Sequence, residues 1–279
     1  MREWEPTPIF DAEPGITPVN KEIELAMSDF NNGYARPLPQ SADMSVDAGL
    51  RSFMLGVYNK VAVGLLVSAV LAYVTGSVPA VRDLLFATQV FPDGVTRLTG
   101  YTLLGMIVAF SPLVILLGSN FVMKNPTSGG ASVLYWLIVA LIGASMGTVV
   151  LLYTGASVVQ TFLITAAAFG GLSLFGYTTK KDLTGIGSFL IMGVIGLIIA
   201  SVVNIFLQSG MMQMIISIAG VLIFAGLTAY DTQRLKMTYY ALGGNQNAMG
   251  VATSYGALSL YINFINMFQF LLMLFGGRR

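Results

Sequence analysis

The segment GIGSFLIMGVIGLIIASVVNIFL (residues 185–207) runs for 23 residues without a charged side chain. A helix needs about 20 predominantly apolar residues to cross the hydrocarbon core of a bilayer. Lipid offers no hydrogen bonds to the backbone, so such a run is expected to be helical. Similar runs recur along the chain, and they predict an all-α integral membrane protein with a seven-transmembrane-helix bundle. The predicted spans are about 58–78, 101–122, 132–153, 157–177, 185–207, 211–230 and 254–275.

The composition agrees with a chain solvated by lipid. Of 279 residues, 55% are hydrophobic and only 10% are charged, whereas soluble domains have roughly 25% charged residues. From Leu98 to the C-terminus the only acidic residues are Asp182 and Asp231. The chain has no Cys and no His, which excludes thiolate nucleophiles, the usual zinc sites and Ser-His catalysis. With a single acid in the spans, an intramembrane aspartyl protease is also excluded. We therefore expect neither an enzyme nor a cofactor.

Residues 1–45 differ from the remainder of the chain. They hold six of the ten prolines and most of the acidic residues. This composition predicts a disordered, acidic, Pro-rich tail in front of a membrane domain at 46–279.

The distribution of basic residues predicts the orientation. Lys and Arg collect in cytoplasmic loops. With seven spans, the N-terminus shares a side with a richer set of basic loop residues than the C-terminus does. This set comprises Lys124, Lys180, Lys181, Arg234 and Lys236. We therefore expect a cytoplasmic N-terminus and an external C-terminus.

Several of the predicted spans contain closely spaced glycines. Gly143 and Gly147 form a GxxxG pattern, and Gly170-Gly171 and Gly193 with Gly196 lie mid-span. Small residues let helix backbones approach closely, so we expect these positions to serve helix packing.

Asp231 is the only acidic residue at or inside an apolar run, and it closes the predicted span 211–230. It could mark the membrane interface and pair with Arg234 one turn further on. Alternatively, it faces inward and binds or senses cations, because an ionised Asp within a bilayer is costly and usually functional. Position alone leaves both readings open.

The predicted seventh span carries a polar stripe. On a helical wheel, its members fall within roughly one third of the circumference. They are Tyr255, Ser259, Asn263, Asn266 and Gln269. Lipid cannot satisfy amides, so this stripe should face protein or water. The stripe favours an inward-facing Asp231, although structural hydrogen bonding between helices explains the stripe equally well.

Three stretches of the chain resemble the Bax inhibitor-1 family, also called the transmembrane Bax inhibitor motif family, in its bacterial form. They are YTGAS (153–157) continuing through AAAFGG (166–171) to GYTTKKDL (176–183), then FAGLTAYDTQ (224–233), and ALSLYINFIN (257–266). The resemblance runs from about Gly49 to the end of the chain. It implies seven helices, with the last helix central between layers made from the other six.

The resemblance also implies a pH-sensitive calcium leak, gated by two Asp residues that share a proton. Asp231 matches the first of the pair, but the second position holds Asn263. Two close carboxylates repel each other, so the pair keeps a proton to higher pH than one carboxylate would. An Asp facing an Asn lacks this repulsion, so the usual switch is altered here.

These observations lead to two expectations of function. The first is a cation leak in the bacterial inner membrane, with calcium as the expected ion and Asp231 as a transient calcium contact. The resemblance also allows a different class, a non-transporting regulator that binds membrane proteins such as a membrane-bound quality-control protease.

Overall fold

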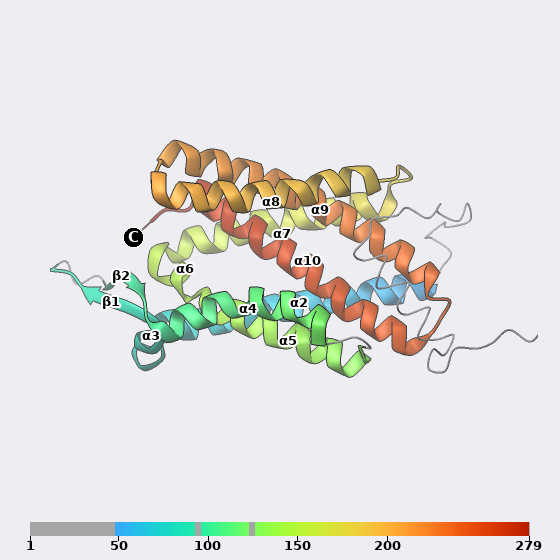
Figure 1. Ribbon diagram of the computed structural model, residues 1–279, viewed down its shortest axis with the longest axis horizontal. Coiled ribbons are helices and arrows are strands. Elements are labelled where there is room, and N and C mark those ends of the chain that lie inside the picture. The colour runs from blue at the N-terminus through green and yellow to red at the C-terminus, as the bar shows by residue number, and fades with distance from the viewer. Residues whose placement is uncertain (1–47, 93–95, 123–125, 279) are drawn as a thin grey trace, which may run out of the picture.

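The computed structural model describes residues 48–92, 96–122 and 126–278 (Figure 1). The predicted tail, residues 1–45, lies outside this part of the chain. Almost every described element is a helix. The elements are α2 (Ala48–Ser77), α3 (Pro79–Leu85), β1 (Phe86–Val90), β2 (Thr96–Tyr101), α4 (Leu103–Val122), α5 (Ser128–Ser145), α6 (Gly147–Leu152), α7 (Gly155–Thr178), α8 (Thr184–Leu207), α9 (Gly210–Ala241) and α10 (Gln246–Phe275).

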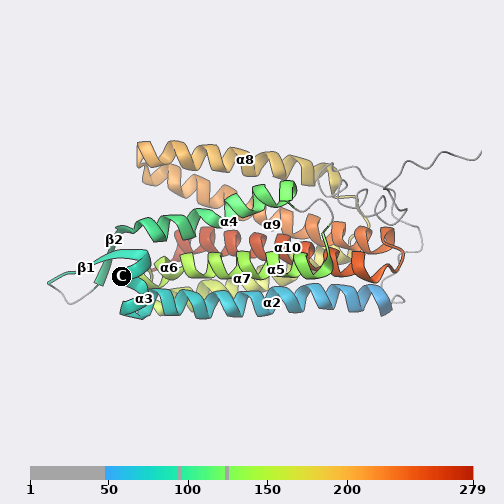
Figure 2. The same cartoon turned by 60° about the horizontal axis from the view of Figure 1, so that its bottom comes forward.

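The last helix is central, as expected. Figure 1 shows α10 running diagonally between α8 and α9 on one side and α2, α4 and α5 on the other, and Figure 2 also places it inside the bundle. Of its most apolar 18-residue window, 56% is buried, against 17–39% in the other long apolar helices described. A helix enclosed by protein can carry polar side chains that lipid would not tolerate.

Six helical segments among the described residues are long and apolar enough to cross a membrane: α2, α5 with α6, α7, α8, α9 and α10. The described apolar part of α4, Leu103–Ser119, is shorter than these. However, α4 carries the chain from the hairpin end of the bundle back to the end where α5 begins (Figure 1). The seventh span stays a prediction.

A β-hairpin departs from the all-α expectation. Strands β1 and β2 pair antiparallel between α3 and α4, with an irregularity at Ala87/Thr88. The intervening sequence, Pro92-Asp93-Gly94, carries the residues favoured in turns. The hairpin is anchored at its base by Phe86, which is 1% exposed and packs in a small cluster with Leu85 and Leu151.

The predicted span 132–153 is interrupted rather than continuous. Helix α5 ends at Ser145 and α6 begins at Gly147. The Thr75 hydroxyl donates to the carbonyl of Ala144 (3.0 Å), which supplies a partner at the end of α5. A Cβ at Gly147 would lie 2.7 Å from the Phe86 ring and 3.0 Å from the Gly76 nitrogen. The helix therefore breaks where α2 and the hairpin approach it most closely.

The glycines divide into two groups. Gly143 and Gly147 bring α5 and α6 against α2, since a Cβ at Gly143 would lie 2.7 Å from the Cα of Ser68. Gly193 likewise faces Ile223. By contrast, a Cβ at Gly170, Gly171 or Gly196 would meet nothing within 4 Å. The packing role expected for these three glycines is therefore wrong.

Helices α9 and α10 extend beyond the apolar runs that predicted them. Helix α9 continues to Ala241, and α10 starts at Gln246. The tight turn between them uses Gly243 and Gly244 at φ values of +54° and +85°, which favour glycine. Asn245 then caps α10 by accepting from the backbone of Asn247 and Ala248.

Candidate functional site

Asp231 lies in a section of α9 that is buried on every side. Each residue from Leu227 to Gln233 is buried. Two glycines make this possible, because α7 approaches the Ala229 backbone at Gly176 and α8 approaches the Tyr230 ring at Gly187. Packing against both helices leaves Asp231 as a whole residue only 5% exposed.

Both carboxylate oxygens of Asp231 have partners. Oδ2 accepts hydrogen bonds from the Ser259 hydroxyl (2.5 Å) and from Asn263 Nδ2 (2.7 Å), both on α10. Oδ1 lies 3.2 Å from Arg234 Nη2, one turn further along α9. The structure thus brings Asp231 together with Asn263, Ser259 and Arg234. Whether this cluster carries ions or senses pH stays a prediction.

The structure combines the geometric features of both interpretations of Asp231. Its carboxylate faces the central helix, and it also pairs with Arg234. A buried ionised carboxylate without partners would be strongly destabilising. Here a cation and two hydrogen-bond donors offset the loss of hydration. The Arg234 guanidinium also lies over the Tyr230 ring, at 5.6 Å from its centroid.

The remaining members of the polar stripe do not join this cluster. Tyr255, Asn266 and Gln269 are half-buried. Asn266 Nδ2 donates to the Ile262 carbonyl of its own helix (2.9 Å) rather than to a neighbouring helix. Asn266 therefore satisfies part of its amide against the carbonyl four residues earlier in its own helix.

A second polar cluster lies on other faces of α10, and sequence reasoning gave it no role. Lys60 Nζ donates to Ser132 (2.9 Å) and Ser254 (2.8 Å), which joins α2, α5 and α10. Further along α2, Ser68 shares a 2.6 Å hydrogen bond with the Tyr261 hydroxyl. The signal available in the sequence was a Lys within the first apolar run and a Tyr inside the third motif.

Gln233 fastens the Asp231 region to the α7–α8 connection. Its side chain accepts from the Leu183 backbone (2.8 Å) and donates to the Lys181 carbonyl (2.7 Å). This side chain is 1% exposed, and both ends of its amide are satisfied. These two hydrogen bonds lie two residues from Asp231, and they tie this part of α9 to the α7–α8 connection.

The Asp231 cluster does not have the ligand set that a resident calcium ion prefers. Within the described ranges, no group of three or more Asp, Glu, His or Cys residues could hold a metal ion. Calcium prefers six to eight oxygen ligands, and Asp231 supplies a single carboxylate that Arg234 already neutralises.

Comparison with known proteins supports the resemblance seen in the motifs. The sequence profile described as "Inhibitor of apoptosis-promoting Bax1" matches residues 50–279. An uncharacterized protein of Caulobacter vibrioides is 67% identical over 254 residues, covering 91% of this chain and all of that protein. Inner membrane protein YbhL of Escherichia coli (strain K12) is 40% identical over 233 residues, covering 83% of this chain and 94% of its own length. With its motif residues gathered around the central helix and its profile matched over the whole membrane domain, the chain belongs to the Bax inhibitor-1 family.

Proposed function

We propose that this protein is a cation leak pathway in the bacterial inner membrane, and that calcium is among the ions it passes. In this proposal, Asp231 is the carboxylate that permeating cations contact. The observation that carries it is the placement of a buried acid between α9 and the central helix α10. Intramembrane acids are costly and commonly mark ion pathways.

The arrangement described here corresponds to a closed pathway in this proposal. The Asp231 carboxylate is already bonded by two donors, Ser259 and Asn263, and paired with Arg234. A cation reaches Asp231 only after these contacts loosen, which requires α9 and α10 to separate locally or Arg234 to swing away. Arg234 is well placed to move, because its side chain is 20% exposed whereas that of Asp231 is 7% exposed.

Because Asn263 stands where the family resemblance implies a second Asp, the calcium flux is expected to depend on pH differently. Asn263 does not titrate, so the site lacks the second carboxylate of the pair that the family resemblance implies. The native protein is therefore expected to show a calcium flux that changes little between pH 6 and pH 8.

A second candidate is a non-transporting regulator that binds other membrane proteins, such as a quality-control protease. The full pairing of Asp231 with Arg234 and Asn263 favours it, because a neutralised acid attracts cations weakly. The two candidates differ in one measurable respect, since a regulator alone moves no ions.

We expect the purified full-length protein to admit calcium into dye-loaded liposomes. The measurement is the rate of dye response after calcium addition. Liposomes without protein and liposomes with an unrelated polytopic membrane protein serve as controls. If all three preparations respond alike, the leak proposal fails and the regulator becomes the better account.

The proposed orientation places the α7–α8 loop in the cytoplasm and the C-terminus outside. The natural chain lacks Cys, so single-Cys variants report one position each. We expect Arg278→Cys to react with an impermeant thiol reagent in intact spheroplasts, whereas Lys181→Cys reacts only after lysis. The opposite pattern would reverse the orientation, and equal labelling of both positions before lysis would contradict the three crossings between them.

A further inference from the structure

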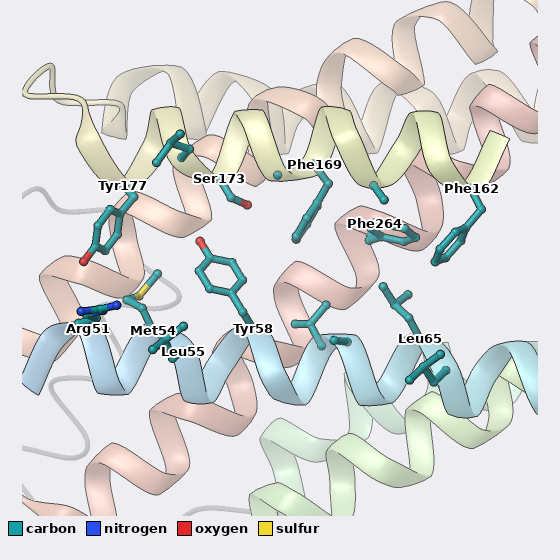
Figure 3. A pocket seen from close by; sticks show the side chains of 16 residues that line it. Arg51, Met54, Leu55, Tyr58, Leu65, Phe162, Phe169, Ser173, Tyr177 and Phe264 are labelled. Atoms are coloured by element: carbon teal, nitrogen blue, oxygen red, sulfur yellow. The ribbon is translucent and has the colours of Figure 1, made fainter. Parts of the chain in front are cut away.

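A groove opens between α2 and α7, with Phe264 of α10 contributing to its lining (Figure 3). Its volume is about 920 Å³, near the upper end of about 300–1,000 Å³ typical of small-molecule sites. Large apolar side chains at its edges, including Leu55, Leu66 and Leu174, are 56–65% exposed. In a membrane-spanning bundle, a groove with such edges opens sideways toward lipid rather than toward water.

The two ends of the groove differ in chemistry. Arg51 and Tyr177 line one end, and Phe162 and Leu65 line the other (Figure 3). No acidic side chain is among the residues that line it. The Arg51 end is also the end of the bundle where α7 leads into the loop with Lys180 and Lys181. A ligand that matches this polarity has an anionic group at one end and a long apolar body.

Two hydroxyl groups interrupt the apolar wall between these ends. The Tyr58 hydroxyl points across the groove toward Ser173 (Figure 3). Ser173 is 5% exposed, and its hydroxyl faces that of Tyr58. A hydroxyl can both donate and accept hydrogen bonds, so this pair can donate to an acceptor oxygen on a bound ligand.

The length of the groove fits one leaflet of a bilayer. Arg51 and Leu66 are 15 residues apart on one continuous helix, which corresponds to about 22 Å along its axis. Half of a bilayer, including its headgroup region, is also about 20–22 Å thick. A lipid with its phosphate at Arg51 would therefore place its ester oxygens near the hydroxyls and its acyl chain along the apolar section.

We propose that this groove binds one anionic glycerophospholipid, with its phosphate at Arg51 and an acyl chain lying between α2 and α7. Arg is well suited to phosphate because its guanidinium donates two parallel hydrogen bonds. The groove lies on a different face of α10 from the Asp231 cluster, so lipid binding and the proposed leak can be tested independently.

Gly170 provides a direct test. It lines the groove, and a Cβ there meets nothing within 4 Å, so Gly170→Phe fills the site without a clash. Gly171→Phe is the matched control, because its neighbourhood is equally open but it lies outside the groove lining. The full-length proteins are purified with phosphatidylglycerol present, and native mass spectrometry measures the fraction that retains one lipid. We expect Gly170→Phe to lower the affinity at least about tenfold, or about 1.4 kcal/mol, and Gly171→Phe to leave it unchanged.

Arg51→Gln removes the positive charge at one end of the groove and leaves its apolar lining unchanged. A basic residue near a membrane surface contributes about 1 kcal/mol toward anionic lipid, so the preference for phosphatidylglycerol over phosphatidylcholine should fall about fivefold. Lys180→Gln removes a charge at the same end without touching the groove, so it should lower the preference clearly less than Arg51→Gln does.

Equal lipid retention by the Gly170→Phe and Gly171→Phe proteins would overturn the proposal. So would a native protein that retains phosphatidylcholine as readily as phosphatidylglycerol. A third outcome, in which a photoreactive label on Leu66→Cys captures residues 1–47 instead of lipid, would assign the groove to the protein's own N-terminal segment.

Discussion

Asn263→Asp is expected to give the calcium flux a pH dependence that the native protein lacks. Asn263 Nδ2 lies 2.7 Å from Asp231 Oδ2, so the substitution places two carboxylates in contact within a buried site. Their repulsion at about 4 Å and an effective dielectric near 20 is roughly 4 kcal/mol. The pair should therefore hold one proton near neutral pH and release it as the pH rises from about 6 to about 8.

The direction of the effect follows from the charges. At the lower pH the shared proton links the carboxylates, and α9 and α10 stay together. At the higher pH both carboxylates are ionised, so they push the helices apart and attract cations more strongly. Flux should therefore rise severalfold between pH 6 and pH 8 in this variant.

Asn266→Asp is the matched control for this prediction. It makes the same substitution one turn along α10, at a half-buried amide that bonds to its own helix. We expect its flux to stay as insensitive to pH as that of the native protein. The interpretation of Asn263 is contradicted if the native protein already responds steeply to pH, or if both Asp variants gain the same response.

Gly176→Leu is expected to cause a large loss of stability. A Cβ at Gly176 would lie 2.8–2.9 Å from backbone carbons of Ala229, whereas carbon atoms pack at about 3.5–4.0 Å. Because the neighbour is backbone, rotamer changes cannot relieve the clash, and α7 must move away from α9. Overpacking of this kind costs about 3 kcal/mol or more.

The measurement is the thermal unfolding midpoint in a fixed detergent. A loss of about 3 kcal/mol corresponds to a decrease of about 10 °C for a chain of this size. Gly171→Leu is the control, because the same change occurs in the same helix where a Cβ meets nothing within 4 Å. Equal midpoints for the two variants would show that the close approach of α7 and α9 is not needed.

Hydropathy was sufficient to predict the main architecture. A run such as residues 185–207 must be a membrane helix because its backbone has no partners in lipid, and the structure has α8 at Thr184–Leu207. The polar stripe predicted for the same reason that α10 faces protein or water, and the family resemblance implied its central position. The hairpin was missed because β1 and β2 are short and half exposed, so their pattern is weak beside the neighbouring apolar runs.

The site was predictable only in part. Asp231 stood out as the one acid in an apolar run, and the family motifs pointed to Asn263. The contributions of Gln233 and Lys60 could not be read from the sequence, because their partners come from the α7–α8 connection and from α5 and α10. Similarly, we expected Gly143 and Gly170 alike to serve helix packing, but Gly143 packs against α2 whereas Gly170 lines a groove.

Calcium flux by the Asp231→Asn protein decides whether Asp231 lies on the proposed cation pathway. This variant keeps the shape of the side chain and removes its charge, and Asp83→Asn makes the same change at a carboxylate that is 58% exposed. The three proteins are reconstituted at equal density in dye-loaded liposomes, and the initial flux is measured at pH 7. The account predicts a flux close to the native value for Asp83→Asn and a loss of at least about tenfold, or about 1.4 kcal/mol, for Asp231→Asn. A native rate of flux in the Asp231→Asn protein would contradict it, because cations would then cross without contacting Asp231.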